Sequence, residues 1–88
     1  MGPVQQRIRD KLMTAFTPEA LTVTDESHLH AGHMGARPEG ETHFRVELTA
    51  AAFAGESRLS RHRMVNAVLK DELAGPVHAL AVRANAPG

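Results

Sequence analysis

The clearest strand signal in the sequence is Thr42-His43-Phe44-Arg45-Val46-Glu47-Leu48-Thr49. Apolar and polar residues alternate along this stretch, which is the period-two pattern of a strand with one buried face. Phe44, Val46 and Leu48 share the apolar face. His43 falls on the opposite face, so we expect it to lie at most at the edge of a site and not to act as a ligand. The pattern predicts a strand over residues 42–49.

A helix and a last strand are predicted downstream of this stretch. The apolar stripe that predicts the buried face of the helix is Leu59, Val65, Leu69 and Leu73. Ser57 suits the N-cap position, and Gly75-Pro76 is a stop signal. The run from Val77 to Val82, which is apolar except for His78, predicts a strand that is covered on part of both faces. Residues 83–88 are predicted to form a frayed tail.

Another helix and another strand are predicted upstream. Pro3 suits the first turn of a helix, and apolar residues then recur at helical spacing as far as Phe16. This pattern predicts a helix over about residues 3–16. Alternating β-branched residues predict a strand from Leu21 to about Glu26. Residues 27–40 are more than a hairpin turn requires, and loops of this length inside a compact domain are usually functional or disordered.

The predicted order is helix, strand, strand, helix, strand. A strand–helix–strand unit closes right-handed with its two strands parallel, so the last strand should run parallel to the second. The first two strands should form an antiparallel hairpin. The sequence therefore predicts an α/β (α+β) fold with a small mixed three-stranded sheet and helices on one face. We expect a single domain over residues 1–88 with an ordered core over about residues 3–83.

The amino-acid composition argues against several classes of function for this protein. The 88 residues carry no net charge at pH 7 with neutral histidines, which argues against holding DNA by bulk electrostatics alone. There is no cysteine, so any thiolate ligand must come from a partner. The sequence has no apolar signal segment and no run long enough to span a bilayer. We therefore expect a cytoplasmic protein without a membrane partner.

Residues 27–40 form a histidine-rich loop that contains His28, His30 and His33. The spacing superficially matches the zinc motif of metallo-β-lactamase-like hydrolases, but Gly32 occupies the place of the aspartate and the chain is too short for that fold. No nucleophile, base and orienting residue are grouped in the sequence either. We therefore expect no enzymatic activity, and we interpret the loop as a source of metal ligands.

Six short segments occur together in an order and spacing that identify a family. They are Asp25-Glu26-Ser27, Gly40-Glu41-Thr42-His43-Phe44-Arg45-Val46, Phe53-x-Gly55, Arg61-His62-Arg63-x-Val65-Asn66, Glu72-Leu73 and Val77-His78-Ala79-Leu80-Ala81. On these segments the chain resembles the BolA family over nearly its whole length. The resemblance implies an α/β domain similar to the type II KH module, in agreement with the predicted order of elements.

The resemblance also implies a function in iron–sulfur cluster handling. BolA-like proteins are known as partners of monothiol glutaredoxins, with which they share a [2Fe–2S] cluster. On this side of the complex the family pattern assigns one ligand to His78 and another to the loop, at His30 or at His33. The glutaredoxin cysteine and glutathione would supply the thiolates, so we expect no cofactor on the chain alone. We expect the free chain to be a monomer or a weak homodimer.

A basic cluster at the start of the second helix supports an alternative function. The cluster is Arg58, Arg61, His62 and Arg63. Bacterial BolA proteins are described as DNA-binding transcriptional regulators in stress response and cell morphology, and the cluster could contact DNA phosphates or a partner. The simpler interpretation is a solvated helix face, partly offset by Asp71 and Glu72.

Overall fold

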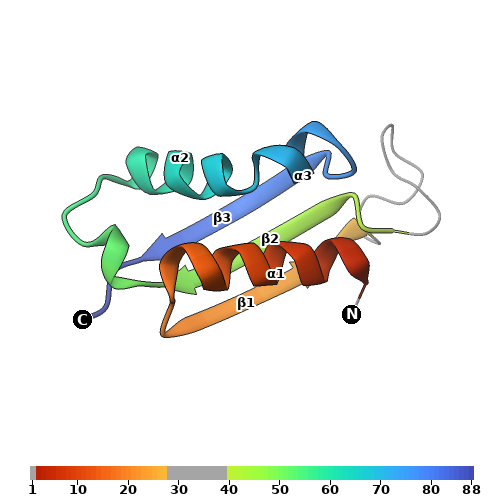
Figure 1. Cartoon of the computed structure of the whole chain (residues 1–88). Helices are drawn as coiled ribbons and strands as arrows, with labels where there is room; N and C mark the ends of the chain where they lie inside the picture. The colour runs from red at the N-terminus through yellow and green to blue at the C-terminus, as the bar shows by residue number, and fades with distance from the viewer. Residues whose placement is uncertain (1, 28–39) are drawn as a thin grey trace.

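The structure, a computed structural model, describes residues 2–27 and 40–88 and follows the predicted order of elements (Figure 1). The elements are α1 (Pro3–Phe16), β1 (Ala20–Asp25), β2 (His43–Thr49), the short 3-10 helix η2 (Ala51–Phe53), α2 (Arg58–Val68), α3 (Lys70–Ala74) and β3 (Ala79–Asn85). The first helix has the predicted bounds and places Val4, Ile8 and Leu12 inside the molecule.

The sheet has the order β1-β2-β3, with β2 in the centre. Strands β1 and β2 are antiparallel, and β2 and β3 are parallel, so Val46 pairs with Val23 on one side and with Val82 on the other. Helices α1 and α2 lie side by side on one face of this sheet (Figure 1). The mixed three-stranded sheet with helices on one face is therefore confirmed.

The core lies between the helices and the sheet. Its fully buried side chains include Ile8 from α1, Val46 from β2 and Val65 from α2. Phe53 closes one end, and its ring centroid lies 4.9 Å from that of Phe16. Because η2 turns the chain right after β2, Phe53 can reach this position.

The predicted second helix is interrupted. Leu69 has backbone angles of φ −98° and ψ 20°, which separate α2 from α3. The buried positions Val65, Leu69 and Glu72 still follow one helical stripe. Leu59 lies six residues before Val65, about 120° away from this stripe at 100° per residue. The prediction that Leu59 is buried was therefore wrong, and its side chain is 60% exposed.

The last strand begins and ends later than the apolar run predicts. It pairs Ala79–Asn85 with His43–Thr49, so Arg83 and Asn85 belong to the sheet and not to a frayed tail. Val77 is buried but lies outside the strand, and its N–H donates to the carbonyl oxygen of Glu72 over 3.0 Å. The apolar run in the sequence thus indicates which residues are buried. Which residues of β3 pair in the sheet is determined by the neighbouring strand β2.

Candidate functional site

His78 lies at the end of the sheet where β1 ends and β2 begins. The backbone N–H of His78 donates to the carbonyl oxygen of Thr42 over 2.7 Å, and the N–H of Ala79 reaches the same oxygen over 3.3 Å. The side chain of His78 is exposed. The backbone is thus fixed by the sheet while the imidazole stays accessible, which is the arrangement that a ligand to a partner-held group requires.

A second histidine lies beside it. The rings of His43 and His78 are stacked, with centroids 6.2 Å apart and planes inclined by 23°. His43 is buried, with 9% of its surface exposed, and its Nδ1 lies 2.7 Å from Oγ1 of Thr42. The polar face of β2 is exposed at Arg45 and Glu47, as predicted, but this end of the face is covered. His43 therefore lies beside His78, and its expected place at the edge of the site stays a prediction.

The parallel register explains why His43 is near His78. His43 pairs with Ala79 across β2 and β3, which brings the preceding residue, His78, within reach of its ring. Sequence reasoning had predicted the parallel pair but not its register. A signal was present, since each histidine stands at the second position of its predicted strand.

Ser27, which follows β1, holds the start of β2 next to this pair of histidines. Its Oγ accepts the N–H of Thr42 over 2.9 Å and the N–H of His43 over 3.2 Å, and the side chain is buried. Asp25 completes the junction, since its carboxylate accepts the N–H groups of Ser27 and Glu41. The residues on either side of segment 28–39 are therefore held next to His43 and His78.

Gly40 begins the return of the chain into β2. Its φ of 77° lies in the left-handed region, and a Cβ there would come within 3.4 Å of Oδ2 of Asp25. Glycine adopts this backbone conformation without the steric cost that other residues meet. Glu41 follows, and its Oε2 accepts the N–H of Gln5 over 2.9 Å, which ties the start of α1 to the same junction.

We predict that Ser27→Ala destabilises the fold by about 2 kcal/mol, because it leaves two buried N–H groups without their acceptor. Urea unfolding monitored by circular dichroism measures the change. Thr24→Ala is the matched control, since Thr24 is an exposed residue of β1, three positions before Ser27, and its loss should cost less than about 0.5 kcal/mol. Equal losses for the two variants would contradict the role of Ser27.

The predicted loop ligands His30 and His33 lie outside the described residues. Within residues 2–27 and 40–88, no three histidine, aspartate or glutamate side chains are grouped to hold a metal ion. His78 is the one predicted metal ligand that the described part of the chain contains.

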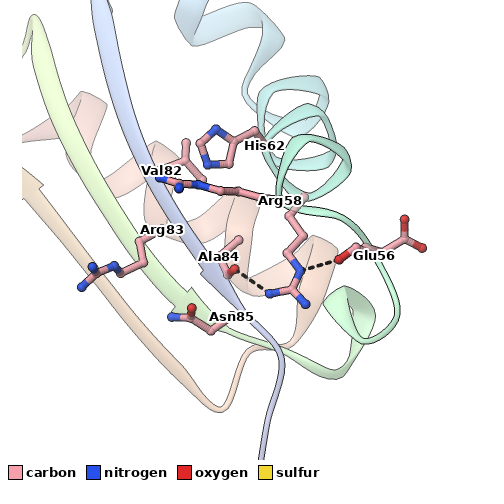
Figure 2. A pocket seen from close by; sticks show the side chains of 8 residues that line it. Glu56, Arg58, His62, Val82, Arg83, Ala84 and Asn85 are labelled. Carbon is pink, nitrogen blue, oxygen red and sulfur yellow. Dashed lines mark hydrogen bonds between the residues drawn. The ribbon is translucent and has the colours of Figure 1, made fainter.

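The predicted basic cluster is only partly brought together. A pocket of about 420 Å³ lies between the start of α2 and the outer edge of β3 (Figure 2). Arg58, Arg61 and His62 line it, whereas Arg63 does not. Because β3 runs from the His78 end toward Asn85, this pocket and His78 lie at opposite ends of the strand.

Arg61 is held in place by the backbone. Its Nε donates to the carbonyl oxygen of Glu56 over 3.0 Å, and its Nη1 donates to the carbonyl oxygen of Ala84 over 3.1 Å. Arg61 lies four residues before Val65, on the stripe of α2 that faces the sheet. It therefore has a structural role in addition to any role in binding.

Glu72 does not offset the basic cluster as expected. Its side chain is 2% exposed and forms ion pairs with α1, at 2.9 Å from Nζ of Lys11 and 3.3 Å from Nε of Arg7. Asp71 also faces Lys11, over 3.7 Å. Both carboxylates thus join α3 to α1. They do not compensate the charges of Arg58 and Arg63.

No helix in the described part of the chain combines the length and apolar character needed to cross a membrane.

Comparisons with known proteins place these features in context. A family model described as BolA-like protein matches residues 12–88. The chain is 51% identical over 87 residues to BolA-like protein 1 of Bos taurus, and the match covers 99% of this chain and 62% of the bovine protein. It is 44% identical over 79 residues to a protein of Escherichia coli (strain K12) named DNA-binding transcriptional regulator BolA, which covers 90% and 71% of the two chains.

A solved structure has the same fold. The BolA domain of SufE1 from Arabidopsis thaliana superposes with a TM-score of 0.90 at 41% sequence identity, covering 99% of this chain and 95% of that one. The fold described above is therefore shared with a domain whose structure has been solved.

Proposed function

This chain belongs to the BolA-like family, and we propose that it is a non-enzymatic, cytoplasmic adaptor that binds a monothiol glutaredoxin and shares a [2Fe–2S] cluster with it. The observation that carries the proposal is His78, an exposed imidazole on a backbone that the sheet fixes. The glutaredoxin role is what the resemblance to the family implies.

The chemistry of the donor set suits this proposal. The chain has no cysteine, so it can offer imidazole nitrogen but no thiolate. Histidine and cysteine ligands together are an established way to hold a two-iron cluster. In the proposed complex His78 is one ligand from this chain, and His30 or His33 remains the predicted second. The glutaredoxin cysteine and glutathione supply the sulfur, and the cluster supplies one-electron chemistry when it is bound.

His43 acts in this proposal as a positioning residue. Its ring is buried, packs against the ring of His78 and is fixed through Thr42 Oγ1. Metal-bound histidines depend on neighbouring groups that set ring orientation. A rigid neighbour restricts the orientations of the His78 ring before the partner arrives and so lowers the entropic cost of binding.

We expect a titration with cluster-loaded monothiol glutaredoxin to perturb the side-chain resonances of His78 and the backbone amides around Thr42 and Ala79. The same titration with the glutaredoxin free of cluster separates docking from ligation, because only ligation changes the imidazole directly. Perturbations that leave His78 unchanged in both titrations would contradict the proposal.

A second candidate function is DNA binding by α2. Among the described residues, neither Arg58 nor Arg63 has an ion pair or hydrogen bond through its side chain, so both charges are available to phosphates. The name of the Escherichia coli relative points the same way. Repeating the titration with duplex DNA tests it, since phosphate contacts predict binding that weakens with salt. If DNA perturbs the resonances of α2 and leaves those of His78 unchanged, DNA binding is favoured.

A further inference from the structure

We propose that the pocket between α2 and the outer edge of β3 binds a phosphate-class anion through Arg58, Arg61 and His62. Its volume of about 420 Å³ lies in the range that small-molecule sites occupy. The inference does not depend on the adaptor function, because the pocket and His78 lie at opposite ends of β3.

The charge of the pocket favours a multiply charged anion. Three arginines and one glutamate line it, and three positive charges less one negative charge leave a net charge of +2 with His62 neutral. Figure 2 shows the Glu56 carboxylate pointing away from the other labelled side chains, and this carboxylate accepts the hydroxyl of Ser60 over 2.6 Å. A phosphate monoester carries about −1.5 to −2 at pH 7, which matches the pocket better than a single carboxylate does.

Arg61 provides a preorganised donor. Its two hydrogen bonds to carbonyl oxygens fix the guanidinium plane, and a guanidinium has five N–H donors, so donors remain for a ligand. Arg58 is exposed on the first turn of the same helix and has no side-chain partner among the described residues. One fixed and one adjustable guanidinium then face the same space, and the fork geometry of each suits phosphate oxygens.

The edge of β3 contributes backbone groups to the same space. The carbonyl oxygen of Ala84 points outward to Arg61, whereas that of Asn85 points inward and accepts the N–H of Ala50. Backbone groups alternate in direction along a strand, so the N–H groups of Val82 and Ala84 also lie on the outer edge. Arg83 also lines the pocket, and Figure 2 shows its side chain directed away from α2, so its charge lies on the side of the pocket that is far from the helix.

Two sources could provide such an anion: a small phosphate compound or the backbone of a nucleic acid. Titration of the isotope-labelled chain with inorganic phosphate, at constant ionic strength set by chloride, tests the shared chemistry. We expect saturable shifts confined to residues 56–62 and 82–85. Duplex DNA is then tested for competition with phosphate. If phosphate displaces the DNA, the natural ligand is a nucleic-acid backbone. If phosphate does not displace the DNA, the natural ligand is a small phosphate compound.

Three variants make this test specific. Arg58→Gln and His62→Gln should each weaken phosphate binding, the former about tenfold for the loss of one charge-assisted contact. Arg63→Gln is the matched control, because Arg63 is exposed on the same helix and does not line the pocket. The proposal is overturned if Arg63→Gln weakens binding as much as Arg58→Gln. It is also overturned if phosphate gives no saturable shift while an Asp/Glu-rich peptide does, which would identify a peptide-binding edge.

Discussion

Replacing His78 with alanine is expected to abolish the cluster shared with a monothiol glutaredoxin while leaving the fold intact. The hydrogen bond that holds His78 in the structure comes from its backbone, whose N–H donates to Thr42, and alanine retains that bond while losing only the stacking on His43. The side chain is exposed, so its removal should change the free energy of unfolding by less than about 0.5 kcal/mol. In the proposed complex, in contrast, the variant would lack one of the ligands that hold the cluster.

The measurement is the visible absorption and circular dichroism of the cluster in the purified complex of the two proteins. His62→Ala is the matched control, because it removes a histidine at the other end of the molecule and should leave the spectrum unchanged. Thermal unfolding of each variant shows whether the fold is retained. An unaltered cluster spectrum in the His78→Ala complex, with glutaredoxin bound, would remove His78 from the site.

The largest expected effect on stability comes from separating Glu72 from its cations. The double variant Arg7→Gln/Lys11→Met leaves a carboxylate that is 2% exposed without a compensating charge. Breaking a buried pair in this way costs about 3–5 kcal/mol. Arg7 and Lys11 are themselves partly exposed, at 53% and 36%, so water reaches this side of the pair and we expect a cost near the lower end, about 3 kcal/mol.

Urea unfolding measures this cost, provided that the dependence on urea is the same for each variant. Adding Glu72→Gln to the double variant is the informative control, because a neutral amide removes the uncompensated charge and should restore part of the stability. A triple variant no more stable than the double variant would show that packing and not charge is responsible.

The pH dependence of stability tests the same ion pairs. Burial raises the pKa of Glu72, but the hydrogen bond from Lys11, a backbone hydrogen bond and the charges of Lys11 and Arg7 together bring the pKa below its ordinary value of 4.5. A lowered folded-state pKa stabilises the fold above the unfolded value, and this contribution disappears as the pH falls through the folded value. The stability difference between the wild type and Glu72→Gln should therefore be constant near neutral pH and shrink below about pH 4.5.

The sequence predicted the fold well where one face of an element is buried. Alternation in β2 and the apolar spacing of α1 report burial directly, and both elements have the predicted bounds to within one residue. The rule for strand–helix–strand units then correctly predicted the parallel pairing of β3. The prediction was wrong for residues whose burial does not match their membership of the strand. Val77 is buried but lies outside β3, whereas Arg83 is exposed but belongs to β3.

The candidate site could be predicted only in part, since its geometry depends on contacts between distant segments. His78 was assigned through the family resemblance, and the structure gives it the accessibility that a ligand needs. The burial of His43 depends on the strand register and on Ser27, neither of which a local pattern encodes. Likewise, the chain gave no sign that Arg61 would bond to the carbonyl oxygen of Ala84, which is 23 residues away.

That bond has a consequence for how the molecule meets copies of itself. β3 is the last strand of the sheet, and such a strand offers unpaired groups on which another chain can extend the sheet. The guanidinium of Arg61 occupies one of these groups, at Ala84, and places a positive charge beside the next. If the β3 strand of a second copy paired there, it would have to displace Arg61 from the carbonyl oxygen of Ala84. It would also bring its own Arg61, and thus a second positive charge, to the same edge. Arg61 therefore disfavours edge-to-edge association of two copies along β3.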